Sequence, residues 1–145
     1  MPPTDPERAE RYATFVPITT RWMDNDVYGH INNVVFYSYF DTAANHVLVH
    51  QGGLDPLASE IIALVVESKC TYHRPLAYPD PLCAGVRVDK LGQRSVTWGI
   101  GIFREGNDVA AAAGQFVHVF VERASRRPAP IPAHIRAVLE GLVRP

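Results

Sequence analysis

Residues 33–50 read NVVFYSYFDTAANHVLVH, a segment with very little charge. One helical face is indicated by spacings of four, three, one and three between its apolar residues Phe36, Phe40, Ala43, Ala44 and Val47. Asp41 is the only acidic or basic residue of the segment apart from two histidines, so a helix here needs protein on most of its sides. Gly52-Gly53 follows, as expected after a helix end. The sequence therefore predicts a long central helix that other elements enclose.

Strand-like segments lie on both sides of this helix in the chain. The first strand is marked, with imperfect alternation, by Phe15, Val16, Ile18, Trp22 and Met23. Four more strands are predicted after Pro56, at about 60–73, 82–90, 94–104 and 109–122. Short turn signals separate them, which favours sequential antiparallel pairing. We therefore predict an α+β fold, with a five-stranded antiparallel sheet wrapped around the long central helix and a short C-terminal helix at about 133–142.

The length of the chain indicates a single domain over residues 1–145. Within it we expect a mobile leader at 1–12, and a Pro-rich connection with the C-terminal helix at 125–145. A formal net charge of -1 gives no global positive field, so we expect no nucleic-acid partner. The start of the sequence lacks the apolar core of a signal peptide, and no run reaches the length of a membrane span. The expectation is a cytoplasmic protein with no membrane partner.

A loop rich in turn-forming residues, RWMDNDVYGHINN at 21–33, connects the first strand to the helix. A helix start offers free backbone N–H groups and the positive end of the helix dipole, an environment that stabilises a developing oxyanion. Asp26 supplies a nearby carboxylate as base or nucleophile, and Gly29 lets ligand or backbone approach closely. Together with Asn33 at the helix start, these residues offer the activated attack and the polarised carbonyl that cleavage of a thioester requires.

Plainer interpretations stand beside this one. Asp24 and Asp26 both fit a helix cap or turn carboxylate, and His30 fits a polar loop residue. Asp41 fits a buried acceptor for loop N–H groups as well as it fits a catalytic role. A calcium loop starting at Asp24 would lack two of its oxygen ligands, so we expect no metal.

The 21–33 motif, followed by a helix that carries Tyr37, Tyr39, Phe40 and Asp41, resembles the hotdog-fold thioesterases of the 4-hydroxybenzoyl-CoA thioesterase type. That group includes related acyl-CoA and acyl-acyl-carrier-protein hydrolases. Residues 65–82 resemble its second strand and Arg-Pro turn, and residues 131–142 resemble its closing segment. The sequence departs from the family at Tyr78-Pro79-Asp80, where relatives commonly have a Gly-Asp turn. The resemblance implies a hotdog fold over most of the chain.

The resemblance also implies a reaction, the hydrolysis of an acyl-CoA thioester to a free acid and CoA. It makes Asp26 the catalytic carboxylate, as nucleophile or as general base, and gives the backbone N–H of Asn33 the role of polarising the carbonyl. Further residues that it implies at the site are His30 and Asp41 for catalysis, and Gly29, Asn32 and Tyr37 for substrate. Charge alone adds Arg74 as a contact for the phosphates of CoA. No cofactor is expected, because CoA is part of the substrate.

Two other functions remain open on the sequence: hydrolysis of acyl-carrier-protein thioesters, and a non-catalytic acyl-CoA binding module on the same fold. A sheet curled over one helix leaves edge strands that a second copy can cover. A homodimer or homotetramer is therefore expected.

Overall fold

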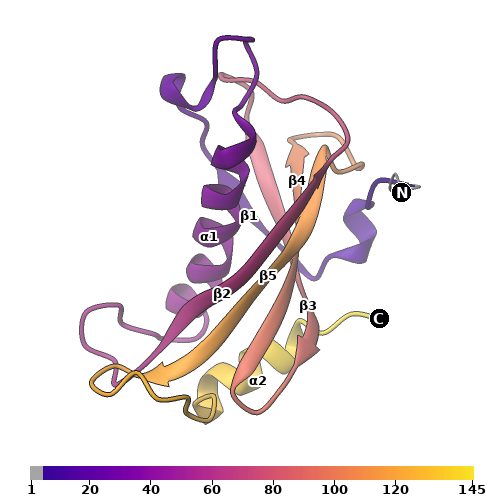
Figure 1. Ribbon diagram of the computed structural model, residues 1–145. Coiled ribbons are helices and arrows are strands. Elements are labelled where there is room, and N and C mark those ends of the chain that lie inside the picture. Colours follow the sequence, from indigo (N-terminus) through magenta and orange to yellow (C-terminus); the bar gives the residue numbers. More distant parts are fainter. Residues whose placement is uncertain (1–4) are drawn as a thin grey trace.

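A computed structural model describes residues 5–145 of the protein, and it shows one antiparallel sheet curved around a long helix (Figure 1). The two 3-10 turns are η1 (Ala9–Arg11) and η2 (Trp22–Asp24), and the helices are α1 (Asn33–His50) and α2 (Ala133–Gly141). The strands are β1 (Thr14–Ile18), β2 (Ile61–Tyr72), β3 (Leu82–Leu91), β4 (Ser95–Arg104) and β5 (Ala112–Glu122). This is the predicted α+β hotdog architecture, which is confirmed.

The order of the strands in the sheet is β1-β3-β4-β5-β2. The expected sequential pairing is therefore correct from β3 to β5 but wrong for β2, which pairs with β5 instead of β3. The connection between β2 and β3 explains the difference. Residues 73–81 contain three prolines, so they do not form a tight hairpin and instead cross the top of the sheet in Figure 1. Both β1 and β2 are consequently edge strands.

Helix α1 buries one face against the concave side of the sheet. The buried side chains of this face are Phe36, Tyr39, Phe40, Ala43, Ala44, Val47 and Leu48. The opposite face is exposed, including Val34 and Asp41. The expectation that protein encloses the helix on most sides is therefore wrong for the single chain, because one sheet covers only one side of a helix.

The first strand ends earlier than its apolar residues suggested. Trp22 and Met23 lie in η2 instead of β1, and their exposed fractions are 82% and 73%. The Asp24 carboxylate accepts a hydrogen bond from the N–H of Arg21, at 3.0 Å, and this bond closes the chain into a turn. Local capping thus places Trp22 and Met23 in a turn although their apolar character suggested a strand.

The N-terminal residues 5–12 pack against the sheet, whereas a mobile leader was expected for 1–12; residues 1–4 lie outside the described part. Tyr12 is buried over the glycines at positions 85 and 101, where a Cβ atom would lie 2.7 and 2.6 Å from Tyr12 atoms. The missing side chains therefore make room for the tyrosine ring.

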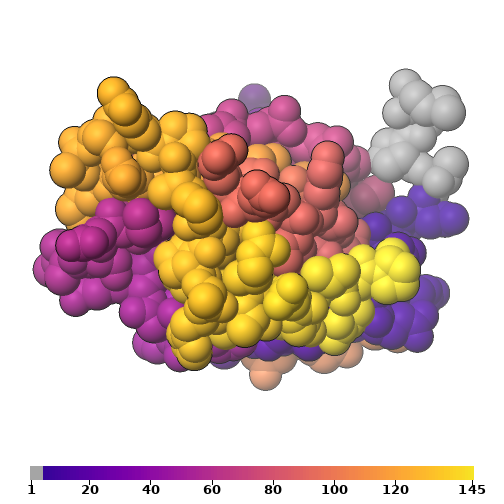
Figure 2. All heavy atoms as spheres, turned by 90° about the horizontal axis from the view of Figure 1, so that it is seen from below, coloured from indigo at the N-terminus to yellow at the C-terminus, as the bar shows by residue number. Residues whose placement is uncertain are grey.

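The C-terminal segment covers the opposite end of the molecule. Figure 2 shows it, in yellow, spread between the magenta loop that follows α1 and the indigo N-terminal segment. Ile135 and Leu139 of α2 join the same core as α1. Within residues 5–145, no helix is long and apolar enough to cross a membrane.

Candidate active site

The loop between η2 and α1 is closed by its own backbone. Asn25 and Ile31 form an isolated antiparallel bridge, and inside it the N–H of Asp26 donates to the carbonyl of His30 at 2.9 Å. Gly29 has a φ of +83°, in the left-handed region that favours glycine. No atom lies within 4 Å of the position that its Cβ would take. The backbone conformation of the turn therefore explains why a glycine stands at position 29. Close packing does not explain it, because none of the described residues lies near the missing side chain.

Asp24 ties this loop to the helix. Its side chain is only 1% exposed, and Oδ2 accepts a hydrogen bond from the hydroxyl of Tyr39 at 2.7 Å. Burial raises the pKa of Tyr39, and the neighbouring Asp24 carboxylate raises it further. The Arg21 side chain also bonds this carboxylate, and the carbonyl of Asp24 accepts the N–H of Asn32 at 2.9 Å. Asp24 is therefore a structural acceptor, as its plainer interpretation suggested.

The first turn of α1 is capped by Asn32. Its Oδ1 accepts the N–H of Val34 at 3.0 Å, and its carbonyl accepts the N–H of Val35 at 2.9 Å. The N–H of Asn33, in contrast, has no acceptor within residues 5–145. An N-cap asparagine thus satisfies part of the helix start and leaves one donor available at the beginning of the helix.

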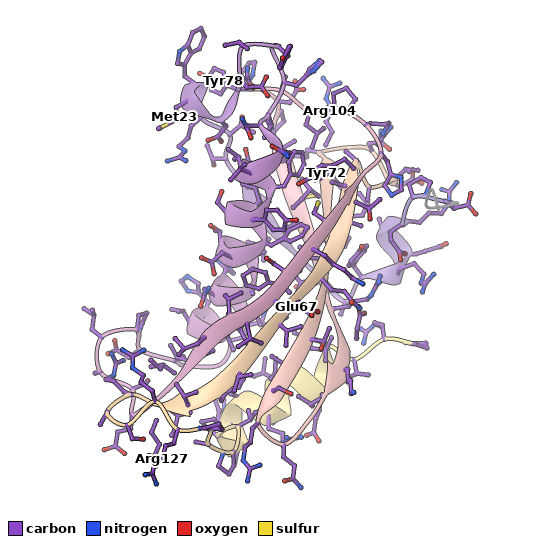
Figure 3. All side chains as sticks on the ribbon, in the orientation of Figure 1. Met23, Glu67, Tyr72, Tyr78, Arg104 and Arg127 are labelled. Carbon is purple, nitrogen blue, oxygen red and sulfur yellow. The ribbon has the colours of Figure 1, made fainter. Side chains whose placement is uncertain are left out.

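A cavity of about 290 Å³ lies where α1 begins and β2 ends. Its lining residues are His30, Ile31, Asn33, Phe36, Tyr72, His73, Arg74 and Pro75. Figure 3 shows Tyr72 at the upper end of β2, beside the first turn of α1. The Tyr72 hydroxyl donates to the carbonyl of Asn33 at 2.8 Å, and burial, followed by the influence of Cys70, raises the pKa of Tyr72. The hydroxyl therefore stays protonated and keeps its bond to the helix start.

The structure brings together three of the residues proposed for the site: His30, Asn33 and Arg74 all line the cavity. The guanidinium of Arg74 also donates to the carbonyl of Val109 at 2.7 Å, which fixes it at the rim. The lining is completed by Ile31, Phe36, Tyr72, His73 and Pro75, none of which was predicted as a site residue from the sequence. Their one signal in the sequence is adjacency, since each lies within three residues of an assigned position.

Other proposed residues lie outside the cavity lining of the single chain. Asp26 is half-buried, and its Oδ1 accepts the N–H of Tyr28 at 2.9 Å. Asp41 is exposed and accepts the side-chain amide of Asn45. Tyr37 is half-buried and packs edge-to-face on Phe40. Asn33, Tyr37 and Asp41 are four residues apart along α1 and therefore share one side of the helix, but only Asn33 lines the cavity.

The turn at Tyr78–Asp80, where the sequence departs from the family pattern, packs against the Asp26 loop. The N–H of Tyr78 donates to the side chain of Asn25 at 2.9 Å, and its ring meets that of Trp22 edge-to-face. Figure 3 shows Met23 and Tyr78 together above α1. The variant turn therefore supports the loop that carries Asp26.

Comparison with known proteins assigns the chain to a family and identifies solved structures with the same fold. Residues 28–111 match the thioesterase superfamily, so the chain belongs to that family and is a thioester hydrolase. The PA5185 protein of Pseudomonas aeruginosa is 50% identical, with a TM-score of 0.95 over 97% of this chain and 98% of that one. No functionally curated protein matches this sequence.

Two further solved structures share the fold. A predicted thioesterase from Bacillus stearothermophilus is 25% identical, with a TM-score of 0.76 over 90% of this chain and 97% of its own. A 1,4-dihydroxy-2-naphthoyl-CoA thioesterase from Synechocystis is 16% identical, with a TM-score of 0.78 over 90% of this chain and 98% of its own. At that identity the likeness concerns the fold alone.

Proposed function

We propose that the protein hydrolyses an acyl-CoA thioester to a carboxylic acid and CoA at the cavity between α1 and β2. The observation that carries this proposal is the backbone N–H of Asn33, which has no acceptor among residues 5–145, stands at the start of a helix and lines the cavity. A thioester carbonyl that accepts this N–H is polarised by the bond and by the positive end of the α1 dipole. Arg74 at the rim offers a cation to the phosphates of CoA.

Asp26 provides the carboxylate for the attack. Its Oδ1 is held by the N–H of Tyr28, and within residues 5–145 its Oδ2 has no partner. Its backbone is bonded to His30, which lines the cavity, so the carboxylate belongs to the loop that forms the rim. A fixed carboxylate with one free oxygen suits nucleophilic attack or the activation of water.

Two routes fit this arrangement. In the first, Oδ2 of Asp26 attacks the carbonyl carbon, CoA leaves as a thiolate that takes up a proton, and water hydrolyses the resulting anhydride. In the second, Asp26 takes a proton from water as the water oxygen attacks the carbonyl carbon, the C–S bond breaks, and the CoA thiolate takes up the proton. A single turnover in ¹⁸O-water tests for the first route: label in the carboxylate of Asp26 requires the anhydride, opened by water at the aspartyl carbon, because the second route puts label only into the product acid.

Asp26→Asn tests the proposal. The amide is neither a nucleophile nor a base, so we expect kcat to fall by a factor of about 100 or more. Release of free thiol from acyl-CoA measures turnover. Asp108→Asn is the matched control, since Asp108 is an exposed carboxylate paired with Arg8 outside the cavity lining. Full turnover by the Asp26 variant would remove this residue from the mechanism. The same acyl group presented on CoA and on a carrier protein distinguishes the two substrate classes.

A further inference from the structure

The cavity has an apolar wall formed by Ile31, Phe36, Tyr72 and Pro75. Ile31 and Phe36 are its buried members, whereas Tyr72 and Pro75 lie at the exposed side. The polar lining residues carry the groups assigned above to thioester binding or lie beside them. The Tyr72 hydroxyl is already bonded to Asn33. The wall therefore presents mainly carbon surface to whatever enters the cavity.

Phe36 closes the cavity toward the protein core. Its exposed fraction is 3%, and its ring packs edge-to-face on Tyr72 at 5.2 Å and on Tyr39 at 5.9 Å between ring centroids. Behind it, the hydroxyl of Tyr39 is fixed by the buried carboxylate of Asp24. Protein interiors are close-packed, so a ligand cannot pass this ring without displacing it.

The cavity measures about 290 Å³ and is open to solvent, with the Phe36 ring on the side that faces the core. An acyl chain that extends from the N–H of Asn33 toward the core therefore meets this ring, and a longer chain has to displace it.

We propose that Phe36, supported by Tyr72, sets the depth of the acyl site, so that the enzyme prefers short or single-ring acyl groups without charge. This inference rests on the proposed function of the same cavity. Phe36 was assigned to the core by its helical spacing alone, and the structure gives it a second role as the end wall of the site.

The test compares kcat/KM for acetyl-, butyryl-, benzoyl-, octanoyl-, dodecanoyl- and palmitoyl-CoA in the wild type and in Phe36→Ala and Phe36→Leu. We expect the wild type to prefer the substrates up to benzoyl-CoA over palmitoyl-CoA by a factor of at least about ten. Phe36→Ala should move the optimum to longer chains, and Phe36→Leu should move it less. The ratio of two substrates in one preparation does not depend on the fraction of enzyme that is folded.

Phe120→Leu is the matched control, because Phe120 is a fully buried core phenylalanine outside the cavity lining. It should leave the order of substrates unchanged. A wild-type preference for palmitoyl-CoA, or an unchanged ratio of long to short substrates in both Phe36 variants, would overturn the inference while leaving thioester hydrolysis intact. If no acyl-CoA is hydrolysed at all, the proposed function itself fails.

Discussion

Asp24 and Asp26 are two positions apart and have different environments. Asp24 is buried with both oxygens bonded, whereas Asp26 is half-buried with one oxygen bonded within the described residues. The sequence predicted the loop, allowed a cap or turn role for both carboxylates, and offered the catalytic role to Asp26. It could not separate them by local pattern, because the separation depends on Tyr39, which reaches Asp24 only after α1 has packed on the loop.

Removal of the Tyr39 hydroxyl should therefore act on the neighbouring catalytic loop. Tyr39→Phe leaves the buried Asp24 carboxylate without one of its partners, which costs about 1–3 kcal/mol of unfolding free energy. Because Asp24 also holds Arg21 and Asn32, we expect kcat to fall about tenfold with a smaller change in KM. Steady-state kinetics and urea unfolding measure the two effects.

The control for this prediction is Tyr12→Phe. Tyr12 is equally buried, but its hydroxyl has no partner within residues 5–145 and it lies on the other side of the sheet from α1. Its substitution should leave kcat unchanged. If Tyr39→Phe destabilises the protein and kcat per folded molecule stays at the wild-type value, the Tyr39–Asp24 bond contributes to stability alone.

At the scale of elements, alternation, helical spacing and turn residues predicted five strands and two helices, with nearly correct bounds for all of them except β1. The pairing of the strands was harder to predict, because the alternation within a strand does not identify the strand with which it pairs. The β2 pattern was correct, but its partner is β5. The extent of β1 was also wrong, since Trp22 and Met23 fit a strand by hydrophobicity while Asp24 closes a turn there.

The β4–β5 pair predicts a dependence of stability on pH. His118 of β5 is buried, and its Nδ1 accepts the indole N–H of Trp98 at 3.0 Å. Burial lowers the pKa of His118 from 6.5 to about 4. As the pH falls below 6.5, the unfolded chain takes up a proton here and the folded protein does not until about pH 4. Stability is therefore lost across this window, by roughly 2–3 kcal/mol at pH 4.5 relative to pH 7.

His118→Gln isolates this contribution, because its amide oxygen can still accept the Trp98 N–H while the group no longer titrates. Urea unfolding at pH 7 and pH 4.5 gives the change in unfolding free energy for each protein. We expect the loss on acidification to be smaller in the variant by about 2–3 kcal/mol. An equal loss in both proteins would show that His118 is protonated in the folded state well above pH 4.

At the scale of the whole molecule, the two edges of the sheet differ. The β1 edge is short and contains Pro17, which has no N–H to donate. The β2 edge is long and exposes Val65 and Val66 at 45% and 59%. Figure 3 shows Glu67 midway along it. Since β2 also ends at the cavity, a second copy paired along this edge would lie beside the active site, and we expect a homodimer of this kind.

Charge exchange along β2 tests this dimer. Two antiparallel copies with their two-fold axis at Ser68 place Glu67 of each copy opposite Lys69 of the other. Lys69→Glu creates two like-charge contacts. We therefore expect the variant dimer to begin dissociating at a protein concentration about ten times higher than the wild-type dimer does. Glu67→Lys combined with Lys69→Glu should restore it. Light scattering across a dilution series measures the mass, and a wild-type monomer at every concentration would contradict the dimer.

Strand β2 pairs with β5, which is synthesised about 40 residues after β2 is complete. Ile61–Val66 is an apolar run that emerges from the ribosome early, while the strand that covers it, Ala112–Glu122, is made last among the strands. Until then the run has no backbone partner in its own sheet, and contacts of such long sequence separation form slowly. During translation the apolar segment 61–66 of this enzyme is thus exposed for an interval. Binding by a chaperone at that stage would protect it from aggregation until β5 has been synthesised.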